Sequence, residues 1–475
     1  MKKYQYLVVA GLLLFCFGLK MASLFQTPFA NGWDGYYYLM QLQSIMQDQQ
    51  MQSPDFSLVY PYLLSFRLLI ANDVLAYKVA VGSLTMMFAF TGFLLAYKTT
   101  GKFCLGLLAI ALATFSPTLT FFSTQFVKNL QGIIVLLWFI YFFVKGNKKM
   151  VIIFLVLSFF THRVVAAISI IVFIAYIIQS RFNWKIIAAL AIFLIMASLL
   201  APGIFHISDL QRFQGQLSWL PQLAPLSLAS IWFKNPVDGW WIIEAFAIYG
   251  AYILLLIFLY KNKEPRILMV LATFTILIIP FYQLNVSGIG YRFFLTFLLS
   301  VLVFIPLLFT KIKKQIIYGL TAILLILSFF SIEIYQPKRH DPPQQLYLSL
   351  TGRLENKLKN TDASLIIAHK GLAEVIIYKS NLDALNWVPE YAIAESKVWR
   401  MVYVWPLAKK EQLDGFHYFR LSANYYLIQE LEWQKLVRQA EIENAKDLLA
   451  MINHNLNPAA ERPAYLRKGK NIYYQ

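Results

Sequence analysis

Long apolar stretches separated by short polar connections fill residues 1–335. A helix rises 1.5 Å per residue, so about 20 apolar residues are enough to cross the hydrocarbon core of a bilayer. The sequence predicts about eleven membrane-spanning helices, at residues 5–25, 76–97, 103–122, 127–144, 149–161, 164–180, 185–202, 241–260, 266–284, 293–310 and 315–334.

One apolar stretch, residues 149–180, is interrupted only by the polar group Thr161, His162 and Arg163. A continuous helix of about 30 residues would be about 45 Å long, too long for one upright span. Basic residues flank both ends, so both ends are expected on the same side of the membrane. We therefore expect a short helical hairpin with His162 and Arg163 at its tip. A single steeply tilted helix is the alternative.

The charge pattern agrees with a membrane protein. Of the 475 residues, 59% are hydrophobic and 14% are charged, whereas soluble domains carry about 25% charged residues. The net charge of +18 would suit a nucleic-acid partner, but much of the basic charge lies in alternate connections, as the positive-inside rule requires. These basic residues are Lys2 and Lys3; Lys98 and Lys102; Lys145, Lys148 and Lys149; Arg181 and Lys185; Lys261, Lys263 and Arg266; and Lys311, Lys313 and Lys314.

This pattern predicts a cytoplasmic N-terminus and, after an odd number of spans, a C-terminus outside the cytoplasm. The first apolar stretch is interpreted as an uncleaved signal-anchor, with a cleaved signal peptide as the alternative. Cys16 and Cys104 both lie inside apolar stretches. They are expected to be buried thiols, so no disulfide framework is predicted.

The tail, residues 336–475, has ordinary polar composition and is long enough for a domain of its own. Residues 363–371 are typical of a strand and turn, 371–380 of a helix or strand, and 425–440 of a strand that runs into a helix. The sequence therefore predicts a polytopic α-helical membrane domain over 1–335, followed by a small α/β or α+β extracytoplasmic domain over 336–475.

The first polar loop holds one carboxylate among aromatic residues, in the stretch "WDGYYYLMQLQ" at 33–43. We expect a helix that starts near Asp34 and carries Tyr37 and Tyr38, followed by an amphipathic stretch at 57–70. An interfacial loop with an aromatic belt and an aspartate in a turn would have a similar sequence.

Three basic residues, Lys128, Arg163 and Arg292, lie near the outer ends of predicted spans, where the charge pattern does not require them. A basic side chain near the end of a span also reaches toward the lipid headgroups without further function, which would explain each of the three residues taken alone. Further polar candidates in or beside the loop 203–240 are Asp209, Arg212, Asp238 and Glu244. No P-loop, nucleophile elbow or metal-ligand spacing of His and Cys is present.

These residues together resemble the GT-C superfamily of polytopic glycosyltransferases, which use lipid-phosphate-linked sugars, and in particular its dolichyl-phosphate-mannose-dependent and aminoarabinose-transferase-like members. The resemblance is carried by Asp-x-x-Tyr-Tyr-hydrophobic after the first span, and by "SPTLTFFSTQFVKNLQGIIVLL" at 116–137, "SFFTHRVVAA" at 158–167 and "SGIGYRFFLTFLL" at 287–299. Many relatives have two adjacent acidic residues, whereas Gly35 follows Asp34 here, which leaves the binding of a divalent metal open.

The resemblance implies a role for each candidate. Asp34 would be the catalytic base, and Tyr37 and Tyr38 would contact substrate. The donor phosphate would bind Arg292, Lys128, Arg163 and His162. The implied activity is inverting transfer of a sugar from a polyprenyl-phosphate carrier to a glycan, lipid or protein on the periplasmic face of the inner membrane.

Three other classes stay open. A transporter or flippase of lipid-linked glycans would carry charges near mid-bilayer and inverted repeats, but the polar residues here gather at the outer ends. A polysaccharide polymerase or ligase would share the spans and a large outer loop, but would not predict the acidic motif. A non-catalytic membrane scaffold would need none of these residues.

Overall fold

The computed structural model describes residues 2–52, 55, 57–180, 236–278, 289–334, 341, 343–359, 361, 363, 365–380, 382–385, 397–403, 418–422 and 424–443. The chain divides into two compact units. The first consists of Met1–Asn31 and Ser53–Gln336, and the second of Gly32–Gln52 and Pro337–Gln475. Sequence analysis placed residues 32–52 with the membrane part, whereas their contacts place them with the tail.

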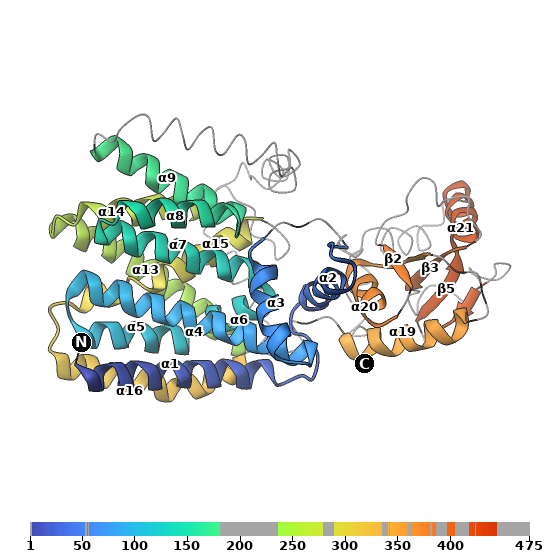
Figure 1. Ribbon diagram of the computed structural model, residues 1–475, viewed down its shortest axis with the longest axis horizontal. Coiled ribbons are helices and arrows are strands. Elements are labelled where there is room, and N and C mark those ends of the chain that lie inside the picture. Colours follow the sequence, from blue (N-terminus) through green and yellow to red (C-terminus); the bar gives the residue numbers. More distant parts are fainter. Residues whose placement is uncertain are drawn as a thin grey trace. The chain divides into compact units, whose positions relative to one another are not determined.

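Helices form the whole described part of the first unit (Figure 1). They are α1 (Lys3–Leu24), α3 (Val59–Leu69), α4 (Asp73–Thr100), α5 (Phe103–Phe115), α6 (Pro117–Gln125), α7 (Val127–Lys145), α8 (Lys148–Phe159), α9 (Arg163–Ser180), α13 (Pro236–Lys261), α14 (Pro265–Phe274), α15 (Ile289–Leu302), α16 (Lys314–Leu327) and α17 (Ser331–Ile334), with the 3-10 turns η1 (Thr275–Ile278), η2 (Ile305–Phe309) and η3 (Ser328–Phe330). Six helical segments in the described residues are long and apolar enough to cross a membrane, or seven if α5 and α6 form one bent span.

The prediction of eleven spans is thus met in part. The predicted span at 185–202 lies outside the described residues. Helices α9 and α14 are apolar but shorter than a full span over their described length. The break predicted at 161–163 is confirmed one residue earlier, at 160–162, because α8 ends at Phe159, α9 begins at Arg163 and the two helices pack against each other.

Helix α4 lies at the centre of the first unit, packed against α1, α5 and α7 (Figure 1). Its buried Phe93 shows how closely it approaches α5. A Cβ atom at Gly106 would stand 2.6 Å from the Phe93 ring, so the contact requires glycine at that position. Cys16 and Cys104 are buried free thiols, as predicted.

The span predicted at 103–122 is bent by 58° between α5 and α6, a feature that the sequence did not predict. Pro117 has no amide hydrogen to continue the α5 ladder, and it restricts the preceding residue to extended backbone. Ser116 accordingly has ψ 113°, and its hydroxyl accepts a hydrogen bond from the Leu119 amide at 3.0 Å, which caps α6.

Two contacts join connections that are distant in the sequence, one at each end of the first unit. At one end, the Lys102 ammonium donates to the Thr310 carbonyl. At the other end, the Leu58 amide donates to the Phe160 carbonyl at 2.7 Å. The grouping agrees with the charge pattern, because Lys102 and the lysines after Thr310 both belong to the predicted cytoplasmic connections. The side of the membrane that each end faces stays a prediction.

The second unit is built around a five-stranded mixed sheet of order β2-β1-β3-β5-β4. Its elements are α2 (Gly35–Asp48), α19 (Gln344–Leu358), β1 (Leu365–Ile367), α20 (Lys370–Lys379), β2 (Asp383–Leu385), β3 (Val398–Tyr403), β4 (Tyr418–Arg420), β5 (Tyr425–Gln429) and α21 (Glu430–Ile442). Strand β1 pairs in parallel with β2 and β3, whereas β5 pairs antiparallel with β3 and β4. The predicted strand at 363–371 and the predicted strand-to-helix segment at 425–440 are confirmed, and 371–380 is a helix.

Helix α2 belongs to this unit through α20, against which it packs. The Tyr36 and Tyr378 rings lie 5.5 Å apart. The loop before α2 is held as well, because the Gly32 amide donates to the buried Asp341 carboxylate at 2.9 Å.

Candidate functional site

The turn between α8 and α9 packs directly on α7. A Cβ atom at Gly132 would stand 2.8 Å from the Cβ of His162, so this glycine allows the close approach. Lys128 lies four residues before Gly132, which is about one helical turn earlier on α7. The turn therefore brings His162 to the end of α7 that carries Lys128.

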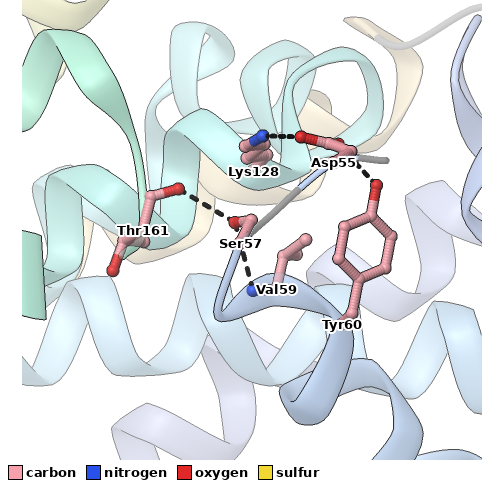
Figure 2. A network of polar contacts seen from close by, with 6 residues as sticks. All are labelled: Asp55, Ser57, Val59, Tyr60, Lys128 and Thr161. Carbon is pink, nitrogen blue, oxygen red and sulfur yellow. Dashed lines mark hydrogen bonds and ion pairs between the residues drawn. The ribbon is translucent and has the colours of Figure 1, made fainter. Parts of the chain in front are cut away.

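A network of polar contacts fixes the segment before α3 to the same place (Figure 2). Lys128 forms an ion pair with Asp55, whose other carboxylate oxygen accepts a hydrogen bond from the Tyr60 hydroxyl at 2.6 Å. The Ser57 hydroxyl donates to the Thr161 carbonyl at 2.9 Å. Residues from α3, α7 and the α8–α9 turn thus meet at one end of the first unit.

Arg292, from a distant part of the sequence, places a second cation near Lys128. It is an exposed residue in the first turn of α15, and its guanidinium lies 5.2 Å from the centre of the Phe126 ring. Phe126 is two residues before Lys128, so this cation–π contact brings α15 next to the start of α7. Arg163 is the first residue of α9 and follows His162 directly.

The electrostatics of His162 reflect this gathering of cations. Burial, together with the nearby cations Lys128, Arg292 and Arg163, lowers the pKa of His162 to about 3, whereas Asp55 opposes the shift. The imidazole is therefore neutral at pH 7, with one donor and one acceptor nitrogen. Its buried Nδ1 has no hydrogen-bond partner among the described residues.

We name Lys128, Arg163, Arg292 and His162 the cation cluster. Sequence analysis selected all four residues, and the structure brings them together from α7, the α8–α9 turn and α15. Cations beside a neutral imidazole suit an anion such as a phosphate, because arginine offers a two-pronged fork, lysine a point charge and imidazole a hydrogen bond without further charge.

Asp34 is the N-cap residue of α2 and is half-buried, so the predicted helix start is confirmed. Tyr37 and Tyr38 follow in its first turn, with ring centres 5.8 Å apart. These three residues belong to the second unit, whereas the cation cluster belongs to the first. No group of three His, Cys, Asp or Glu side chains suited to a metal occurs among the described residues.

The structure places none of the remaining polar candidates in the cation cluster. Asp209 and Arg212 lie outside the described residues, as does the side chain of Asp238. Glu244 lies on α13 and accepts a hydrogen bond from the Thr118 amide at 2.8 Å. It belongs to the helix break rather than to the cation cluster.

Asp55 is the charged member of this network that the sequence did not single out. Its partner Lys128 is 73 residues away, and no local pattern indicates such a pairing. A single acidic residue ahead of an amphipathic helix looks like an ordinary turn residue.

Comparison with solved structures shows which known fold this chain shares. Two crystal structures of ArnT from Cupriavidus metallidurans have a fold similar to that of this chain. The apo structure aligns with a TM-score of 0.57 and the structure bound to undecaprenyl phosphate with 0.58; each is 9% identical and covers 90% of this chain and 98% of ArnT. No family model matches the sequence, and no curated protein matches it significantly.

Proposed function

We propose that this protein is an inverting glycosyltransferase of the inner membrane. It transfers a sugar from a polyprenyl-phosphate carrier to a glycan, lipid or protein acceptor on the periplasmic face. The observation that carries the proposal is the cation cluster, in which Lys128, Arg163 and Arg292 gather around the neutral His162. The fold shared with ArnT, one structure of which contains undecaprenyl phosphate, supports the same class of ligand.

In this proposal the cation cluster binds the phosphate of the donor. As the bond between the sugar C1 and the phosphate oxygen breaks, the oxygen keeps the electron pair and its negative charge grows. Fixed cations in a site of low dielectric stabilise that charge without having to reorganise. His162 contributes a hydrogen bond and, because it is neutral, does not hold the charged product as a cation would.

Asp34 is proposed as the base for the acceptor. The acceptor hydroxyl attacks C1 from the side opposite the phosphate, and its proton passes to the Asp34 carboxylate. One displacement inverts the configuration at C1 and requires no covalent enzyme intermediate. Tyr37 and Tyr38, one turn further along α2, are proposed to contact the substrate.

The test is the release of polyprenyl phosphate from a polyprenyl-phosphate sugar by purified protein. Arg292→Ala removes a charged donor from the proposed leaving-group site, so turnover should fall by about 10²–10³-fold. Arg292→Lys should recover part of the activity because it restores the charge but not the fork. Arg266→Ala is the matched control, since Arg266 is also exposed and also lies in the first turn of a helix, α14.

Full activity of Arg292→Ala would remove Arg292 from the donor site. Wild-type protein that moves a lipid-linked glycan across the bilayer but releases no polyprenyl phosphate would identify a flippase instead. Elongation of a glycan from a lipid-linked glycan donor, with no use of a single-sugar donor, would favour a polymerase or ligase.

A further inference from the structure

The cation cluster has a carboxylate of its own. Asp55 pairs with Lys128, and the side chains of the two residues are 20% and 21% exposed, respectively. Figure 2 shows the Asp55 carboxylate between the Lys128 ammonium and the Tyr60 hydroxyl. An anion of the protein therefore binds the same ammonium to which a phosphate ligand would bind.

The backbone next to Asp55 is held firmly in this position. The Ser57 hydroxyl and the Leu58 amide both donate to carbonyls of the α8–α9 turn, at 2.9 and 2.7 Å. Gln131 of α7 donates to the Leu58 carbonyl at 3.2 Å. The segment is thus anchored to the two elements that carry Lys128 and His162, and the carboxylate is presented to the cluster rather than to bulk water.

The proposed reaction changes the charge of the lipid in this site. The donor is a phosphodiester with one negative charge, whereas the product is a phosphomonoester whose second proton is lost at a pH of about 6. The cations attract both ligands. A fixed carboxylate opposes each ligand in proportion to its charge, and it competes for the same donor groups.

We propose that Asp55 is an internal competitor for the phosphate site, which selects the singly charged lipid diester over the doubly charged monoester and thereby promotes release of the lipid phosphate product. This inference rests on the proposed function. Among the described residues, Asp55 contacts Lys128 and Tyr60 and acts electrostatically on His162, on which Arg163 and Arg292 act as well. All of them stay unchanged when Asp55 alone is replaced.

The experiment compares binding of two lipids that differ only in charge, undecaprenyl phosphate and its methyl diester, to the purified full-length protein in detergent at pH 7.5. For Asp55→Asn we expect binding of the monoester to tighten by about tenfold, the scale of one close charge pair. Binding of the diester should tighten by about threefold, because it carries half the charge. Tyr60→Phe, which removes one hydrogen bond to the carboxylate, should change the ratio of the two affinities less.

Asp73→Asn is the matched control. It breaks the Arg67–Asp73 ion pair of the same unit, whose side chains are similarly exposed, at 25% and 29%. Both lipids should bind this variant as they bind the wild type. A weaker monoester affinity in Asp55→Asn would show that Asp55 orients Lys128 instead, and equal changes for both lipids would also overturn the inference. If the wild type binds neither lipid, the proposed function fails, and that result differs from each of the others.

Discussion

Asp34 is the residue on which the proposed chemistry depends most. Asp34→Asn keeps the shape and the hydrogen-bonding reach of the side chain but removes the base. Turnover should therefore fall by about 10²–10⁴-fold, the usual contribution of a general base. The thermal stability of the variant should stay near that of the wild type, because the Asp34 side chain makes no capping hydrogen bond that the change would remove. Turnover of a polyprenyl-phosphate sugar at matched stability measures the effect.

Asp48→Asn provides the comparison for Asp34, since Asp48 is the last residue of the same helix. Its turnover should equal that of the wild type. If Asp34→Asn is as active as Asp48→Asn, Asp34 is only a helix cap, and the base must be sought elsewhere.

At the residue scale, the sequence was informative where a residue departs from what its position requires. Lys128 and Arg292 drew attention because basic residues are expected at the other ends of the spans, and the structure brings both to the cation cluster. The local sequence around Asp55 shows no such departure. Its partner is fixed by the packing of α3 against α7, which no pattern of single residues reports.

At the element scale, the break between α5 and α6 is the feature that most needs support. It leaves backbone groups without helical partners inside the membrane part. Lys20, which is buried on α1, donates to the Ser116 carbonyl at 3.3 Å and to the Thr120 hydroxyl at 2.6 Å. Glu244 of α13 accepts from the Thr118 amide on the other side of the break. Lys20 and Glu244 thus supply hydrogen bonds to the two sides of the bend.

We predict that Glu244→Ala destabilises the protein by about 1–3 kcal/mol, because it leaves the buried Thr118 amide without its acceptor. Glu244→Gln should cost less, since the amide oxygen still accepts. Thermal unfolding in detergent measures both changes. Glu264→Ala is the control, because Glu264 is exposed and its side chain makes no capping hydrogen bond. Equal unfolding temperatures for Glu244→Ala and Glu264→Ala would show that the bend is held by packing alone.

The apolar pattern located most of these helices because each span must satisfy its own backbone and present apolar side chains. It did not reveal the bend. The span predicted at 103–122 stays apolar across Pro117, and proline is tolerated in membrane helices when neighbours satisfy the freed groups. Here the neighbours are α1 and α13, which are distant in sequence, so the bend required the tertiary structure.

At the scale of the whole molecule, the charge pattern predicts that the tail lies outside the cytoplasm. Alkaline phosphatase fused after Pro343 should therefore be active, because the enzyme requires an oxidising compartment. The same reporter after Lys148, in a predicted cytoplasmic connection, should be inactive. The opposite pair of results would show that a span has been miscounted, and would place His162 and Arg163 away from the periplasm.

The division into two units was harder to predict than the spans. The change in composition near residue 336 is visible in the sequence. The membership of residues 32–52 is not, because it depends on contacts between α2 and α20. Local patterns assign a segment to a type of structure and do not report which distant segment it will join.

This membership has a consequence for the order in which the protein is made. Helix α2 leaves the ribosome early, but its partners in the second unit come after residue 336. At roughly 5–20 residues per second, translation of residues 53–336 takes about 15–60 s. Throughout that interval α2 lacks the helix against which it finally packs. The membrane helices can be inserted one after another, whereas the surroundings of Asp34 are completed last.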